Sequence, residues 1–343
     1  MARATTPGAI EDSRLRPTVV DDPGVVLSVV VPVFDEQDNV LPLLAALSTS
    51  LAATGRSHEV IVVDDGSTDE TYPRLARQAE LDDRVRLVKL RRNYGQTAAL
   101  AAGFDHARGE VIVTLDGDLQ NDPADIGILL AKLDEGYDLV SGWRQDRKDN
   151  LGRRIPSRVA NWLIGFVTGV RLHDYGCTLK AYRAEIAEET RLYGEMHRFL
   201  PALAHMAGAR ITEVPVRHHP RVSGRSKYGI GRTFKVLLDL LTVKFLAVWS
   251  TKPSHVFGGS GIVLCVVGSG FVVWTAYEKL VNGIYVYRQP ALLVGVFLFT
   301  IGINLVLLGL LAELIVRTHH ESPTRRPYQV RELRNFGEQT PHS

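Results

Sequence analysis

The chain has few cysteines, little net charge and no dinucleotide-binding glycine motif. Its 343 residues include two cysteines, Cys177 and Cys265, and neither belongs to a CxxC pair. A zinc-binding or disulfide-stabilised scaffold is therefore not expected. The formal net charge of +2 gives no basis for a nucleic-acid partner. No GxGxxG follows the first apolar segment, which argues against a nicotinamide-dependent dehydrogenase.

The beginning of the chain also lacks a long apolar run. Residues 1–24 contain no hydrophobic segment of the kind found in a secretory signal, and we expect them to form a disordered arm. Apolar residues are concentrated instead in the last third of the chain. The length suits one large domain with an appended segment.

Between about residues 25 and 140, short apolar segments alternate with segments of helical periodicity. The predicted strands are 27–31, 59–63, 85–90, 111–115 and 139–142, and the predicted helices are 39–51, 70–81 and 97–107. Such alternation is typical of right-handed βαβ units. The predicted fold class is therefore α/β with a mainly parallel sheet.

Acidic residues follow three of these strands. The segment 111–122 (VIVTLDGDLQND) ends its apolar run in Asp116-Gly117-Asp118, and Gln120 lies two residues further on. Two carboxylates and an amide carbonyl can hold a divalent cation whose open positions take a substrate phosphate. An Asp-x-Asp alone would equally suit a solvated turn. The acidic ends of the strands at 59–63 and 27–31 favour a site at this edge of the sheet.

The last third of the chain predicts a membrane hairpin. Segments 257–277 and 291–316 are apolar and long enough to span a bilayer, and residues 231–256 before them predict juxtamembrane amphipathic helices. Basic residues flank both outer ends of the hairpin, and residues 317–343 form a basic tail. We therefore expect a multi-pass inner-membrane protein whose large domain and both termini are cytoplasmic. Glycines on the first span leave room for packing between subunits, so a homo-oligomer is one expectation.

Four motifs in order (PVFDE, VVDDGSTD, LDGDLQ and RVSGRSKYG), together with the terminal hairpin, resemble one family. It is the membrane-anchored family-2 glycosyltransferases that transfer sugars to polyprenyl phosphates, which include dolichol-phosphate mannose synthase. The resemblance covers about residues 27–316. It implies a GT-A (Rossmann-like) catalytic domain over residues 25–230, followed by interfacial helices and a two-helix transmembrane hairpin.

The resemblance also assigns roles to residues, on the positions that match the family's motifs. The positions implied to bind the nucleotide sugar are Pro32, Phe34, Glu36, Asp65, Asp116, Gly117, Asp118, Gln120, Arg221 and Lys227. Among them, Asp116, Asp118 and Gln120 are implied to hold Mg²⁺ or Mn²⁺. Arg144, Arg153 and Ser157 are implied to hold the acceptor phosphate. The predicted catalytic residues are Asp118, Asp174 and Arg144, although Cys177-Thr178 departs from the Gly-Phe that often follows the aspartate in the family.

The expected reaction is transfer of a sugar, with inversion, from a nucleotide sugar to a polyprenyl phosphate, among membrane lipids and for the cell envelope. A UDP-hexose is the favoured donor, with a GDP-mannose-dependent polyprenyl-phosphate mannose synthase as the alternative. A non-catalytic membrane subunit that binds lipid phosphate is the alternative from another class. A processive polysaccharide synthase is disfavoured because the chain has no QxxRW motif and too few spans to build a channel.

Overall fold

The computed structural model describes residues 25–145, 164–165, 168–189, 199–220, 253–285, 289–321 and 326–336. The predicted N-terminal arm and residues 231–252 of the predicted juxtamembrane helices lie outside the described residues. So do four predicted site residues, Arg153, Ser157, Arg221 and Lys227.

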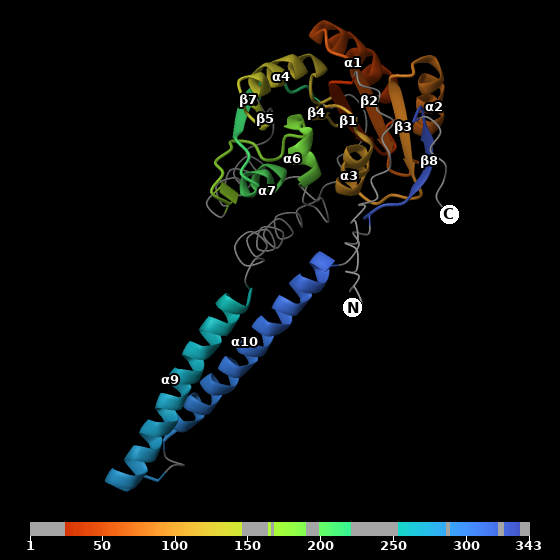
Figure 1. Cartoon of the computed structure of the whole chain (residues 1–343). Helices are drawn as coiled ribbons and strands as arrows, with labels where there is room; N and C mark the ends of the chain where they lie inside the picture. The colour runs from red at the N-terminus through yellow and green to blue at the C-terminus, as the bar shows by residue number, and fades with distance from the viewer. Residues whose placement is uncertain are drawn as a thin grey trace, which may run out of the picture.

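The catalytic-domain sequence folds around one mixed sheet with helices on both faces (Figure 1). The strands of the described chain are β1 (Leu27–Val33), β2 (His58–Asp64), β3 (Val85–Leu90), β4 (Val111–Thr114), β5 (Leu139–Arg144), β6 (Lys180–Arg183), β7 (Ile211–Val216) and β8 (Val330–Arg334). Their order in the sheet is β7-β5-β6-β4-β1-β2-β3-β8. The β6 and β8 strands run antiparallel to their neighbours, and the other pairings are parallel.

The strands in the middle of the sheet are buried on both faces, which explains their continuous apolar sequences. Val29 and Val31 belong to a core shared with α1 (Val40–Thr54), α2 (Thr71–Leu81) and α4 (Ile126–Asp134). Val30 points to the other face and packs with α3 (Gln96–His106), α6 (Ala184–Glu189) and α7 (Leu200–Met206). These last three helices lie on the side of the sheet nearer to the hairpin (Figure 1).

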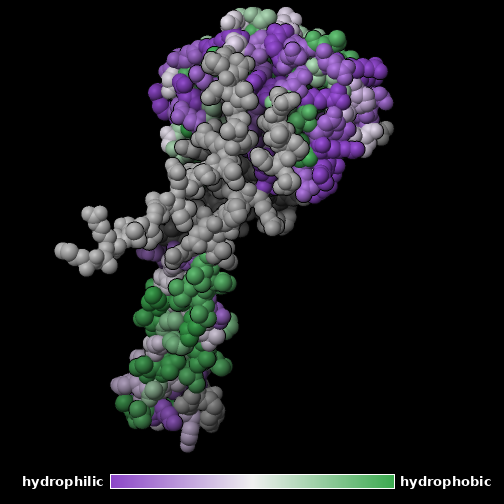
Figure 2. Space-filling view, turned by 45° about the vertical axis from the view of Figure 1, so that its right-hand side comes forward, coloured by the Kyte–Doolittle hydropathy of each residue, from purple (hydrophilic) through white to green (hydrophobic). Residues whose placement is uncertain are grey.

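Two long helices extend away from this domain as a hairpin, α9 (Pro253–Asn282) and α10 (Pro290–Glu321). They contain apolar segments of 29 and 25 residues, Ser254–Asn282 and Pro290–Leu314, which are long enough to cross a membrane. Most of their side chains face outward, and Figure 2 shows a hydrophobic surface along the hairpin that contrasts with the polar domain. Exposed apolar surface of this extent is typical of a lipid-facing segment.

Glycines let the two helices of the hairpin approach closely. A Cβ at Gly261 would lie 2.6 Å from the Gly302 carbonyl oxygen, and one at Gly268 would lie 2.6 Å from the Gly295 carbonyl oxygen. Small residues serve this purpose in membrane helix pairs. These two glycines of the first span therefore allow α9 to pack against α10 within the same chain. At the domain end of the hairpin, Ser254 donates from its hydroxyl to Glu313 at 2.9 Å.

The chain returns from the hairpin to the sheet. Within the predicted basic tail, β8 pairs antiparallel with β3 and becomes the edge strand of the sheet. Asn335, just beyond β8, donates from its side-chain amide to the carbonyls of Ala79 and Val85 at 2.7 and 2.8 Å. The hairpin is thus joined to the same domain at both ends.

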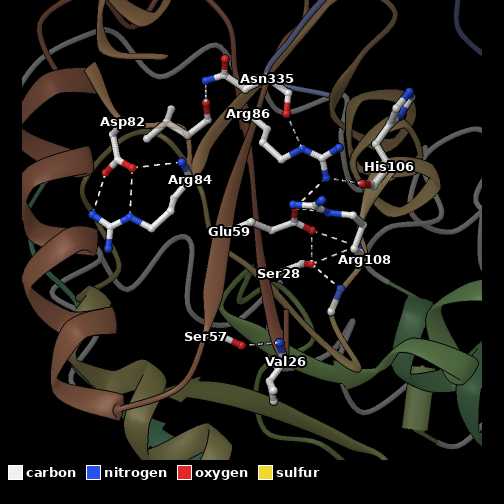
Figure 3. A network of polar contacts seen from close by, with 12 residues as sticks. Val26, Ser28, Ser57, Glu59, Asp82, Arg84, Arg86, His106, Arg108 and Asn335 are labelled. Carbon is white, nitrogen blue, oxygen red and sulfur yellow. Dashed lines mark hydrogen bonds and ion pairs between the residues drawn. The ribbon is translucent and has the colours of Figure 1, made fainter. Parts of the chain in front are cut away.

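A buried ion network joins β8 to the N-terminal end of β2 (Figure 3). Glu59 is 1% exposed and accepts hydrogen bonds from Ser28, Arg86 and Arg108 at 2.6 to 3.0 Å. Arg86 also donates to the Asn335 carbonyl at 3.1 Å. Burial raises the pKa of Glu59, but Arg86 and the hydrogen bonds outweigh burial and hold that pKa below its usual value.

Candidate functional site

The strand ends that carry the predicted acidic residues meet at one edge of the sheet. The β1 strand pairs in parallel with both β2 and β4, so that Val33 lies beside Asp64 and Val30 beside Thr114. The segments that follow these strands, 34–36, 64–69 and 115–122, therefore adjoin one another. This is the edge at which open α/β sheets bind ligands.

The Asp116–Asp118 turn packs tightly against the end of β1. A Cβ at Gly117 would lie 2.7 Å from Val33 Cγ1, so the close approach requires glycine at this position. Asp118 is 7% exposed and accepts a hydrogen bond from the Gln120 backbone at 3.1 Å. Asp116 accepts from the Gln96 side chain at 2.7 Å, which ties the turn to the first residue of α3.

Two carboxylates share this turn. Burial and, after it, the neighbouring Asp118 carboxylate raise the pKa of Asp116 to about 6. A hydrogen bond from Thr178 and the charges of Arg144 and Lys180 act in the opposite direction. A carboxylate whose ionisation is disfavoured by a neighbouring carboxylate provides a site where a bound cation would relieve the repulsion.

The donor set fits a divalent cation that keeps open coordination positions. In the described part of the chain, no three His, Cys, Asp or Glu side chains cluster as a closed metal site. Asp116, Asp118 and Gln120 instead offer oxygen ligands from one short turn, which suits Mg²⁺ or Mn²⁺ shared with a substrate phosphate.

Arg144 and Asp174 form a two-point ion pair beside this turn. Arg144, at the end of β5, donates from Nε at 2.7 Å and from a terminal nitrogen at 3.0 Å to the two oxygens of Asp174. Asp174 also accepts from the Gly176 backbone at 3.0 Å. Burial lowers the pKa of Arg144, but Asp174 outweighs burial and raises that pKa above its usual value. The guanidinium is therefore a fixed cation, held in place by a carboxylate.

The predicted nucleoside side of the site is built by two loops that bond to each other. Pro32, Phe34 and Glu36 are half-buried after or at the end of β1, and the backbone of Glu36 donates to Thr71 at 2.8 Å. Asp65 accepts from the backbone of Tyr94 and Gly95 at 2.7 and 2.8 Å. In this structure, Asp65 thus holds the loop between β3 and α3 in place.

The segment that leads toward the predicted donor-binding loop is fastened to the acidic turn. The His219 backbone donates to the Gln120 carbonyl at 2.8 Å. Arg217 donates to Asp125 from its backbone at 2.6 Å and from its side chain at 2.7 Å. The chain therefore leaves the described domain, toward Arg221 and Lys227, from directly beside the predicted cation ligands.

The structure adds three polar residues that the sequence motifs did not identify. Gln96 bonds to Asp116, Asn121 donates from its side chain to Thr178 at 2.9 Å, and Lys180 lies buried at the start of β6. Gln96 begins a helix and Lys180 stands in a short antiparallel strand, so neither belongs to a recognisable acidic strand end. Pairing of β4 with β6 brings Lys180 to the site.

Comparison with known proteins identifies the family. Residues 28–191 match the model of glycosyl transferase family 2. A dodecaprenyl-phosphate galacturonate synthase of Rhizobium johnstonii is 44% identical over 90% of this chain and 92% of that protein. The chain belongs to glycosyl transferase family 2. An undecaprenyl-phosphate 4-deoxy-4-formamido-L-arabinose transferase of Salmonella typhimurium is 36% identical over 92% of this chain and 95% of its own length.

Solved structures agree on the fold. A glucosyl-3-phosphoglycerate synthase of Mycobacterium tuberculosis, in complex with Mn²⁺, UDP and phosphoglyceric acid, superposes with a TM-score of 0.51. It is 22% identical and covers 65% of this chain and 79% of its own. The predicted GT-A fold is confirmed.

The predicted enzyme class is also confirmed: the protein is a glycosyltransferase, and both relatives are polyprenyl-phosphate sugar transferases by name. The non-catalytic alternative is set aside.

Proposed function

We propose that the protein transfers a sugar from a nucleotide sugar, with a UDP-sugar favoured, to the phosphate of a polyprenyl phosphate at the membrane surface. The observation that carries this proposal is the Asp116–Asp118 turn beside the Arg144–Asp174 ion pair, in a domain joined at both ends to an apolar hairpin. The two carboxylates of the turn suit a cation that binds a nucleotide sugar, and Arg144 suits an anionic acceptor. The apolar hairpin suits an acceptor that is a lipid. The names of the two relatives support the acceptor.

The chemistry of the acceptor makes a general base less necessary. A phosphate monoester has its second pKa near 6 and is an anionic nucleophile at neutral pH. Its oxygen forms a bond to the anomeric carbon while the bond from that carbon to the nucleoside diphosphate breaks, and the electron pair leaves with the diphosphate. A single in-line displacement of this kind inverts the anomeric carbon.

The residues divide into those for the donor and those for the acceptor. Asp116, Asp118 and Gln120 would hold Mg²⁺ or Mn²⁺, which when bound offsets charge on the departing diphosphate. On the same proposal, Arg221 and Lys227 close over the donor, whose nucleoside lies against Pro32, Phe34, Glu36 and Asp65. Arg144, with Arg153 and Ser157, binds the acceptor phosphate.

Asp174 is better suited to positioning than to proton transfer. Both of its oxygens accept hydrogen bonds from Arg144, and one also accepts from the Gly176 backbone. A carboxylate bound in this way fixes the direction of the guanidinium. Arg144 can then present its remaining donors to an oxygen of the phosphate.

The proposed topology places the domain and both termini in the cytoplasm. Support comes from β8, which joins the sheet of the domain directly after the hairpin, so both outer ends of the hairpin lie on the domain side. Basic residues flank these ends, as expected for the cytoplasmic face.

A lipid-extraction assay on membranes that contain the full chain tests the function. Labelled UDP-glucose, UDP-galactose, UDP-galacturonate, UDP-N-acetylglucosamine, UDP-4-deoxy-4-formamido-arabinose and GDP-mannose are supplied in turn with polyprenyl phosphate. We expect organic-soluble label from a UDP-sugar and its loss with EDTA. Label from GDP-mannose alone would support the mannose-synthase alternative. No transfer from any of these donors by folded protein with Mg²⁺ or Mn²⁺ would contradict the proposal.

The cation ligands are tested in the same assay with Asp118→Asn. We expect turnover to fall at least about 100-fold, because a ligand and a charge at the leaving group are removed. The control is Asp83→Asn, an exposed carboxylate before β3, which should leave turnover unchanged. Full activity of Asp118→Asn would contradict the assignment of the cation site.

A further inference from the structure

Lys180 is a buried lysine located between the two strands that carry the site. It pairs with Thr114 on β4 and with Ser141 on β5. Asp116 lies two residues after Thr114, and Arg144 lies three residues after Ser141. Lys180 is 3% exposed. Its side chain, Asp116 and residues 175–178 all line one small cavity.

The ammonium group of Lys180 has a carbonyl partner rather than a carboxylate partner. It donates to the Cys177 carbonyl. Within the described residues, no carboxylate lies at salt-bridge distance from it, whereas Arg144 is paired directly with Asp174. A lysine that is almost fully buried without a paired acid is unusual, because burial disfavours the charged form.

The charges around Lys180 act against the effect of burial on its ammonium. Burial, followed by the charge of Arg144, holds the pKa of Lys180 below its usual value, while Asp174 and Asp116 are among the groups that raise it. Among the described residues, and counted as ionised, the carboxylates of Asp116, Asp118 and Asp174 outnumber the cations Arg144 and Lys180 by one. Without Lys180 the site would carry one more net negative charge.

We infer that Lys180 is a positioning residue whose fixed charge lowers repulsion between the acidic turn and the diphosphate of the donor. The inference rests on the proposed function, because it requires a diphosphate and a cation at Asp116 and Asp118. Lys180 does not itself touch the reacting atoms. It acts through the electrostatic potential at the turn and through the Cys177 carbonyl, which holds the segment 175–178 against the site.

This role predicts opposite effects on the two ligands. Removing a positive charge near the turn weakens the binding of an anion and strengthens the binding of a cation at the same place. A residue that served only to hold the fold would weaken both when removed. The sign of the two changes therefore separates an electrostatic role from a structural one.

The test measures binding rather than turnover, with full-length protein purified in detergent. UDP binding is measured by calorimetry with EDTA present, and Mn²⁺ binding is measured without nucleotide from the signal of free Mn²⁺ in electron paramagnetic resonance. For Lys180→Met we expect UDP affinity to fall about tenfold and Mn²⁺ affinity to rise about threefold to tenfold. Lys180→Arg, which keeps the charge, should remain within about threefold of wild type for both ligands.

Two controls make the outcomes separable. Lys132→Met removes a more exposed lysine on α4 and should change neither affinity. If Lys180→Met does not fold, Lys180→Gln replaces it. Unchanged affinities in the neutral variant, or a fall in both, would overturn the inference while leaving the proposed function standing. Wild-type protein that bound neither UDP nor Mn²⁺ would overturn the proposed function and the inference with it.

Discussion

Two groups of charged side chains lie at opposite ends of the same strands, and they differ in how their charge is balanced. At the N-terminal end of β2, Glu59 is surrounded by Ser28, Arg86 and Arg108, so its oxygens are fully engaged within the protein. At the C-terminal end of β4, Asp116 and Asp118 face each other's charge. Among the described residues, two arginines bind the central carboxylate of the first group, whereas the second group places two carboxylates side by side.

The direction of the pKa shifts expresses this difference. The pKa of Glu59 lies below its usual value although burial raises it, because Arg86 and the hydrogen bonds favour the ionised form. Burial and Asp118 raise the pKa of Asp116 to about 6. A buried carboxylate with a lowered pKa stabilises the fold at neutral pH, whereas one with a raised pKa destabilises it. The comparison separates the structural acid Glu59 from Asp116, the acid proposed to bind a ligand, without reference to sequence motifs.

The largest expected effect comes from Glu59→Gln. Removing the central carboxylate leaves Arg86 buried beside an uncharged group, which should lower the free energy of unfolding by about 3–5 kcal/mol at pH 7. Wild type should lose this contribution as the pH falls through the lowered pKa of Glu59, below the usual value of 4.5. The variant, which has no carboxylate at this position, should not show this loss of stability as the pH falls.

Urea denaturation in detergent, monitored by circular dichroism between pH 3 and 8, measures both effects. Asp83→Asn serves as the control for removing an exposed carboxylate. A variant as stable as wild type at pH 7 would contradict the claim that the Glu59 network stabilises the sheet.

Asp116→Asn should change stability in the opposite direction. Because the folded-state pKa of about 6 lies above the unfolded value of 3.8, the folded protein loses stability as the pH rises between these values. The amide escapes this cost, so with EDTA present the variant should be more stable than wild type by about 1–3 kcal/mol at pH 7. Turnover should fall together with that of Asp118→Asn. A destabilised Asp116→Asn in EDTA would indicate that Asp116 is as well compensated as Glu59.

The sequence predicted the strands β1 to β4 and the helices α1 to α3 because parallel strands and the helices between them have strong local signatures. The predicted strand 85–90 matches β3, and the predicted helices 39–51, 70–81 and 97–107 each lie within a few residues of α1, α2 and α3. Apolar runs buried on both faces and amphipathic helices can be recognised from local periodicity. The acidic residues that follow such runs meet at one edge because the strands are parallel.

The strands β6, β7 and β8 could not be predicted in the same way. β6 has four residues, and its sequence KAYR does not differ from that of a loop. β8 contains three charged residues among five (VRELR). It becomes a strand because it pairs with the edge of β3, from which about 240 residues separate it in the sequence. Pairings of such separation are decided by tertiary structure. For that reason the sequence does not predict that Lys180 lies near the Asp116–Asp118 turn, where the pairing of β6 with β4 places it.

The smallest expected effect tests whether Asn335, just beyond β8, helps to hold that strand against the part of the domain that contains the Glu59 network. Asn335 has a φ of 64°, and its side chain donates to the backbone carbonyls of Ala79 and Val85. Asn335→Ala should lower the free energy of unfolding by about 1–2 kcal/mol, because it loses two hydrogen bonds and places alanine in the left-handed region. Asn335→Gly removes the same bonds without the backbone strain, so its loss should be smaller. Urea denaturation ranks the two variants, and hydrogen exchange of the β3 amides shows whether the edge opens. Equal stability of Asn335→Ala and wild type would mean that the Asn335 side chain does not fasten the strand after the hairpin to the domain.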